Sequence, residues 1–112
     1  MPKVVIYFEG GTDKMTPGQT EKVGAMAAWL KANPRVEVEV AGHTDNGRTA
    51  AFRAELGAAR ARRVVDALVA AGVARDRMSV VAKGEKDPAA SNDSAAGRAE
   101  NRRVTFASRG ER

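Results

Sequence analysis

The residues best suited to hold a ligand are an acid and a base on neighbouring elements. Asp45 ends the loop Gly42–Asp45, which follows a strand-like segment, and ligands commonly bind where strands of an open α/β sheet end. Arg60 shares a helical row with Leu56 and Val64, so it interrupts a row that should face the core. Aspartate accepts hydrogen bonds from an ammonium, and arginine offers a planar fork to a carboxylate. The pair would suit a zwitterionic ligand.

Structural roles are the alternatives for these residues. Asp45 lies just before a helix, where its carboxylate would cap backbone N–H groups. Arg60 at the edge of an apolar stripe would extend its guanidinium to solvent along its aliphatic stem. The neighbouring Arg62 and Arg63 are typical of a solvated helix face.

The residue types in this sequence do not indicate a catalytic site or a metal site. His43 is the only histidine, and the sequence has no cysteine, so no metal-ligand spacing and no thiol nucleophile are present. For His43 we expect loop packing or a backbone hydrogen bond. The spacing of Asp45 and Glu55 does not indicate the carboxylate pair of a glycosidase. We therefore expect a protein that is not an enzyme and needs no cofactor or metal.

Periodicity and turn residues predict the elements that position these side chains. Thr16-Pro17 followed by Gln19 resembles a capping box that would start a helix ending at Asn33-Pro34. The alternation in RVEVEVA predicts a strand with one wet face, carrying Glu37 and Glu39. The predicted strands cover 3–8, 35–41, 77–83 and 102–107, the helices 16–33 and 50–71, and a loop 84–97.

This order, β-α-β-α-β-β, predicts an α/β fold (an α+β sandwich). Its small mixed four-stranded sheet would have two main helices packed on one face. The 112 residues suit a single domain, which we place at 1–108, with a C-terminal tail at 109–112. The N-terminal Met1-Pro2-Lys3-Val4 is not a signal peptide, and no apolar run could insert into a membrane. We expect either a cytosolic chain or a domain of a longer exported protein.

The formal net charge of +5 favours acidic partners without selecting one. Arginines gather between Gly97 and Arg103, where nucleic-acid binding is one interpretation. Few aromatic residues accompany them for bases to stack on, so we expect no nucleic-acid partner. Asn101 would instead tie the preceding loop to the sheet.

Several motifs together resemble one known family, the OmpA-like C-terminal domain, which also occurs in the peptidoglycan-associated lipoprotein and in MotB. The resemblance covers nearly the whole chain, and the order and spacing of the motifs make it specific. The matching residues are Gly42-His43-Thr44-Asp45; Phe52, Leu56, Arg60 and Ala61; Gly84-Glu85-Lys86-Asp87-Pro88; Asn92; Gly97-Arg98; and Asn101-Arg102-Arg103-Val104.

This resemblance implies non-covalent binding of peptidoglycan through the diaminopimelate of its stem peptide. It implies that Asp45 holds the ligand ammonium, Arg60 its carboxylate, and that Thr44 and nearby amides add contacts. It also implies a periplasmic, outer-membrane-associated location, and a larger envelope protein that the domain would anchor to the cell wall.

Two departures from the family pattern lie at the expected ligand pocket. Gly11 replaces an aspartate that the family often has, and Arg53 replaces a common asparagine. We expect Arg53, Leu56 and the Gly11–Thr12 backbone to shape the rim, which the changes make more positive. The remaining motif residues would hold the fold: Gly42, His43, Asn101, Arg102 and Arg103.

These departures leave two alternatives to peptidoglycan binding. One is a diverged structural or protein-interaction domain that has lost the ligand and instead binds a protein partner or forms a homodimer. The other is a nucleic-acid binder driven by net charge.

Overall fold

The computed structural model describes residues 1–112 and has a four-stranded sheet in the order β1-β4-β2-β3. β2 and β3 are parallel, whereas β4 is antiparallel to both β1 and β2. The predicted mixed four-stranded α/β fold is therefore confirmed. The strands are β1 (Ile6–Tyr7), β2 (Val36–His43), β3 (Met78–Gly84) and β4 (Arg103–Glu111); the α-helices are α1 (Gln19–Ala32), α2 (Ala50–Ala70) and α3 (Ala95–Asn101), and a 3₁₀ turn covers Arg75–Arg77.

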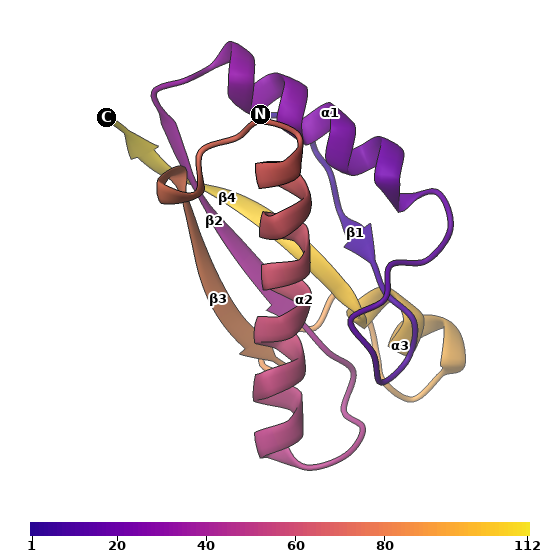
Figure 1. Cartoon of the computed structure of the whole chain (residues 1–112). Coiled ribbons are helices and arrows are strands. Elements are labelled where there is room, and N and C mark those ends of the chain that lie inside the picture. Colours follow the sequence, from indigo (N-terminus) through magenta and orange to yellow (C-terminus); the bar gives the residue numbers. More distant parts are fainter.

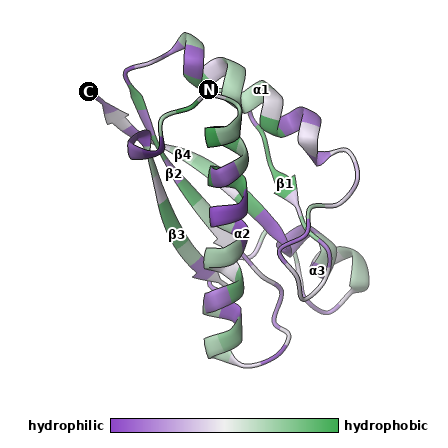
Figure 2. Ribbon diagram, in the orientation of Figure 1, coloured by the Kyte–Doolittle hydropathy of each residue, from purple (hydrophilic) through white to green (hydrophobic).

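Both long helices, α1 and α2, lie on the same face of the sheet, as expected (Figure 1). The core between helices and sheet is mostly aliphatic, with Phe8 as its one aromatic residue. Along its length α2 alternates between hydrophobic and hydrophilic bands (Figure 2). The apolar residues without solvent exposure include Met26, Leu30, Val38, Val40, Val64 and Leu68. None of the helices is long and apolar enough to span a membrane.

The start of α1 differs from the prediction. Gly18, with φ of 88°, is the N-cap residue, and no side chain caps the helix. The expected Thr16–Gln19 capping box is wrong because Gln19 has other partners. Its Oε1 accepts from the Tyr7 backbone N–H at 3.1 Å, and its Nε2 donates to Thr16 Oγ1 at 3.0 Å. The glutamine therefore joins β1 to the turn that enters α1.

α2 begins and ends close to the predicted positions. Thr49 Oγ1 accepts from the Phe52 backbone N–H at 3.1 Å and caps the helix. Gly72, with φ of 102°, follows the helix in the left-handed conformation that glycine favours. Thr49 thus occupies the capping role that had been the structural alternative for Asp45.

Three other boundaries differ from the sequence-based ones. β1 is much shorter than the expected 3–8 strand. The expected loop 84–97 contains the start of α3, capped by Ser94, whose Oγ accepts from the Gly97 N–H at 2.9 Å. Residues 109–112 are not a free tail, since β4 continues to Glu111.

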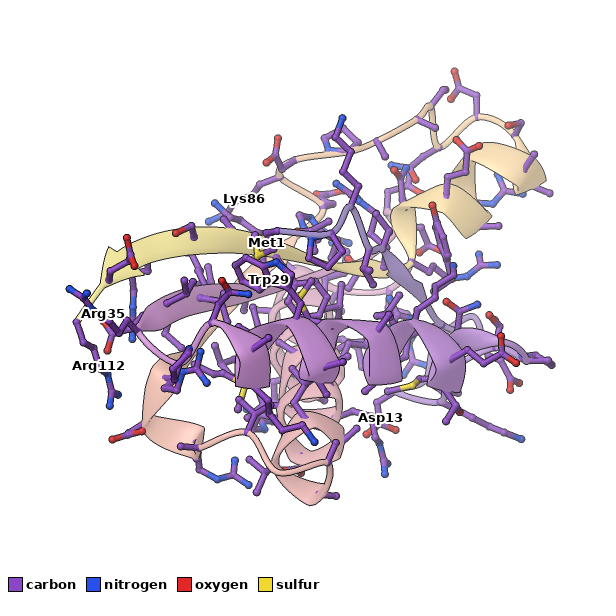
Figure 3. All side chains as sticks on the ribbon, turned by 90° about the horizontal axis from the view of Figure 1, so that it is seen from above. Met1, Asp13, Trp29, Arg35, Lys86 and Arg112 are labelled. Carbon is purple, nitrogen blue, oxygen red and sulfur yellow. The ribbon has the colours of Figure 1, made fainter.

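The extension of β4 is stabilised by charge. Arg112 Nε lies 2.8 Å and Arg109 Nη2 lies 3.7 Å from the Glu37 carboxylate on β2. The Arg35 Nε also donates to the Arg112 carbonyl at 3.1 Å. Figure 3 shows Arg35 and Arg112 together at one end of the molecule, with Asp13 towards the other. The sequence predicts that Glu37 lies on the solvent-facing side of its strand, and there its carboxylate pairs with Arg109 and Arg112.

Candidate functional site

Asp45 lies just beyond the end of β2, with about a fifth of its side chain exposed (21%). Its Oδ1 accepts from the Gly47 backbone N–H at 2.9 Å. Its Oδ2 lies 3.2 Å from Arg102 Nη1, and the Arg102 side chain is exposed to a similar degree (22%). Asp45 therefore presents a partly exposed carboxylate that already has one guanidinium partner.

Arg60 is fully buried, at 0% exposure, and does not extend to solvent. Its guanidinium donates to three backbone carbonyls: Nε to Thr12 at 2.9 Å, Nη1 to His43 at 2.9 Å and Nη2 to Glu9 at 3.0 Å. Burial lowers the pKa of Arg60 to about 10, while the charge of Asp45 opposes this shift, so Arg60 is charged at neutral pH. In this structure Arg60 holds the 9–13 loop through these bonds. The sequence suggested a guanidinium open to a ligand carboxylate, whereas backbone carbonyls occupy it here.

A hollow of about 480 Å³ lies between the 9–13 loop and α2. Gly11, Thr12 and Leu56 line it, which places these three predicted residues around one cavity. Asp45, Thr44 and Arg60 do not line it. Its other walls are Asp13, Phe52, Glu55, Ala58, Ala59 and Arg62.

Arg53 does not lie at the rim of this hollow, contrary to expectation. Its Nη2 lies 2.9 Å from Glu85 Oε1. Its Nη1 donates to the Arg48 carbonyl at 2.6 Å and to the Asn46 and Gly47 carbonyls at 3.4 Å each. Phe52, Glu55 and Leu56 share the helix face towards the hollow, whereas Arg53 projects from the adjacent face.

Thr44 has its hydroxyl directed to backbone rather than to a cavity. It is buried, and its Oγ1 donates to the Asp45 carbonyl at 2.8 Å. Its N–H donates to the Gly84 carbonyl at 2.9 Å. Thr44 therefore shapes the backbone that carries Asp45.

His43 lies on β2, where its ring is only 3% exposed. Its Nε2 pairs with Thr105 Oγ1 at 2.9 Å, whereas its Nδ1 has no partner. Burial, with the nearby charge of Arg103, lowers the pKa of His43 to about 4, so the ring is neutral at pH 7. No group of three His, Asp or Glu side chains gathers here or elsewhere as a metal ion would require.

Asn101 and Arg103 fasten the segment between β3 and β4. Asn101 is fully buried. Its Oδ1 accepts from the Ala89 and Ala90 N–H groups at 2.7 and 3.0 Å, and its Nδ2 donates to the Ala90 carbonyl at 2.8 Å and to Asn92 Oδ1 at 2.9 Å. Arg103 Nη2 donates to the Asp87 carbonyl at 2.9 Å. Both side chains thus bond to backbone groups of the segment before β4.

Sequence reasoning missed two arginines of the site. The sequence motifs assign Arg102 to the fold alone, yet it is the ion-pair partner of Asp45. Arg48 carries its guanidinium carbon 4.1 Å from the centre of the Phe52 ring, next to the hollow. The arginine-rich segment before β4 was a weak signal for Arg102, whereas nothing in the sequence singled out Arg48.

The family model that describes the OmpA family matches residues 7–102. This chain belongs to the OmpA family. It is 40% identical over 99 residues to the peptidoglycan-binding protein ArfA of Mycobacterium tuberculosis, covering 88% of this chain and 30% of that protein. The chain thus spans less than a third of that curated relative.

Solved structures of the family agree with the fold. The peptidoglycan-associated lipoprotein from Burkholderia pseudomallei superposes with a TM-score of 0.89 at 27% identity, covering 96% of this chain and 91% of that one. The C-terminal domain of Helicobacter pylori MotB superposes with a TM-score of 0.88 at 28% identity, covering 98% and 87%. The OmpA-like resemblance inferred from the sequence motifs is therefore confirmed.

Proposed function

We propose that this OmpA-family chain is a non-catalytic peptidoglycan-binding domain of the bacterial cell envelope. Its ligand would be the diaminopimelate of the stem peptide, and its role would be to hold a larger envelope protein to the cell wall on the periplasmic side. Two similar proteins carry peptidoglycan in their names, ArfA and the peptidoglycan-associated lipoprotein. The observation that carries the proposal is the partly exposed Asp45 carboxylate beside the Arg102 guanidinium, on a chain whose surface also has a hollow lined by Gly11, Thr12 and Leu56.

Asp45 and Arg60 have distinct roles in this proposal. Asp45 accepts the ligand ammonium, for which its exposed edge is available. Arg60 receives the ligand carboxylate when the 9–13 loop moves aside and releases the N–H groups now bonded to Glu9 and Thr12. Gly11 leaves this loop without a side-chain carboxylate at that position, which we expect to weaken ammonium binding.

Co-sedimentation with purified diaminopimelate-type sacculi tests the proposal, using Asp45→Asn and a matched control. The control is Asp66→Asn, an exposed aspartate whose Oδ1 lies 2.8 Å from Arg75. We expect wild type and the control to bind at moderate salt, and Asp45→Asn to bind about tenfold more weakly, since it loses a charge-assisted hydrogen bond. Equal binding by Asp45→Asn and wild type would contradict the proposal.

A second candidate function is a protein-interaction domain that has lost the ligand. The enclosed guanidinium of Arg60 favours it, because three backbone carbonyls already occupy that group. This candidate predicts no saturable binding to sacculi, and a homodimer or a defined protein partner in sedimentation velocity. A monomer that binds sacculi through Asp45 would exclude it.

A further inference from the structure

Arg48, in the loop between β2 and α2, has an unusual backbone conformation. Its φ of +67° makes it the only non-glycine residue of the chain in the left-handed region. That conformation is unfavourable for a long side chain and persists only where surrounding contacts impose it.

Arg53 supplies the contacts that impose the conformation. Its Nη1 donates to the carbonyls of Asn46, Gly47 and Arg48, the last at 2.6 Å. Its Nη2 is held 2.9 Å from Glu85 Oε1 in the loop after β3. The Arg53 side chain is only 15% exposed, so α2 and the 85 loop together fix the backbone of the 46–48 loop.

In this conformation the Arg48 guanidinium stacks on the aromatic ring of Phe52. The Arg48 guanidinium carbon is 4.1 Å from the centre of the Phe52 ring, a cation–π arrangement. Phe52 is itself part of the wall of the hollow. Stacking orients the planar fork before any ligand arrives, which reduces the entropy lost on binding.

The Arg48 guanidinium has no carboxylate or carbonyl partner within the protein. It is exposed, forms no ion pair and donates no hydrogen bond. Most other arginines near the hollow are engaged with carboxylates or carbonyls: Arg53, Arg60, Arg63 and Arg102. Arg62 lines the hollow and is also unpaired, but its guanidinium lies on no aromatic ring. A ligand carboxylate that reaches this part of the surface therefore meets an oriented and unpaired guanidinium at Arg48.

We propose that Arg48, stacked on Phe52, is a second carboxylate-binding residue of this domain. This inference rests on the proposed function and narrows its ligand. Arg48 selects acidic peptides that carry a second carboxylate, besides the one on the carbon that also bears the ammonium, and in which this second carboxylate is free rather than amidated. Arg53 is the positioning residue, since it holds the loop that presents Arg48.

Isothermal titration calorimetry, which measures the affinity of the full chain for each of two synthetic peptides, tests this inference. The probes are L-Ala-γ-D-Glu-meso-diaminopimelate and the same peptide with its glutamate α-carboxylate amidated. Wild type should bind the free acid about tenfold more tightly, and Arg48→Gln should lose this preference by weakening only free-acid binding. Arg48→Gly removes the same guanidinium while favouring the left-handed backbone, so it should have the same effect in a folded protein.

The control Arg75→Gln removes an equal charge from an exposed arginine paired with Asp66, and should change neither affinity. Equal binding of both peptides by wild type, or unchanged free-acid binding by Arg48→Gln, would overturn the inference and leave the proposed function standing. Wild type that binds neither the peptides nor sacculi would overturn both.

Discussion

Gly42 on β2 and Gly57 on α2 are in direct backbone contact. The approach is so close that a Cβ atom on Gly42 would overlap the Gly57 carbonyl group. A Cβ on Gly57 would in turn lie 2.7 Å from the Gly42 carbonyl oxygen. The close approach brings α2 down onto the strand that carries His43, Thr44 and Asp45. These two glycines therefore set the distance between the helix of Arg60 and the loop of Asp45.

Gly42→Ala should destabilise the protein by about 3 kcal/mol or more, since helix and strand must separate to admit a methyl group. Urea unfolding measures the change. The control is Gly24→Ala in α1, where a Cβ meets nothing within 4 Å. That substitution should stabilise by about 0.5–1 kcal/mol, because alanine favours helix. Similar effects of the two substitutions would show that the backbone contact is not required.

Acid should destabilise the protein through His43. Its folded-state pKa of about 4 lies below the ordinary 6.5, so the unfolded chain takes up a proton that the folded chain does not. The contribution of the neutral imidazole to the free energy of unfolding is fully present above pH 6.5. It is lost as the pH falls through about 4, and the total loss is about 3 kcal/mol.

Chemical denaturation of wild type and His43→Gln between pH 7.5 and pH 4 measures this loss. A neutral glutamine does not titrate, so the stability difference between the two proteins should shrink as the pH falls. A difference that stays constant over this range would mean that the imidazole is not held neutral.

Removal of the buried amide of Asn101 should release the segment that it fastens. Asn101→Ala leaves the Ala89 and Ala90 N–H groups without their acceptor. We expect a loss of about 2–4 kcal/mol in thermal unfolding, because several buried bonds are lost together. Asn46→Ala, at an exposed asparagine, should change stability by no more than about 0.5 kcal/mol. An equally small effect at Asn101 would contradict its structural role.

Arg60 should control the opening of the 9–13 loop. Arg60→Lys keeps the charge but cannot reproduce the three directed bonds of the guanidinium. Hydrogen exchange should therefore accelerate about tenfold or more at the Glu9 amide, which donates to the Lys14 carbonyl at 2.9 Å across the base of the loop. The exposed Arg62→Lys is the control and should leave exchange unchanged. Unaltered exchange in Arg60→Lys would show that the loop closes without Arg60.

The sequence was sufficient to predict the elements whose signal is local and strong. Alternating valines marked β2, and Gly72 marked the end of α2. α3 was missed because its first residues, Ala95-Ala96-Gly97, are small and carry no apolar stripe. The end of β4 was missed because Arg109 and Arg112 look like a solvated tail until Glu37 is placed opposite them.

The site was only partly predictable for a similar reason. Helical spacing and family motifs singled out Asp45, Leu56 and Arg60, and Leu56 lines the hollow. Neither could show that backbone carbonyls enclose Arg60, since a main-chain acceptor has no residue signature. The Asp45–Arg102 pair joins positions far apart in the chain, and the conformation of Arg48 depends on the position of Arg53. These contacts follow only from the tertiary structure.

The most direct test of the proposed function is an NMR titration of the ¹⁵N-labelled chain with the tripeptide L-Ala-γ-D-Glu-meso-diaminopimelate. We predict saturable shifts of the amides at Gly11, Thr12 and Asp45, with the same shifts in Asp66→Asn and greatly weakened ones in Asp45→Asn. Saturable shifts that persist unchanged in Asp45→Asn, or no saturable shifts in wild type, would contradict the claim that Asp45 holds the diaminopimelate of peptidoglycan.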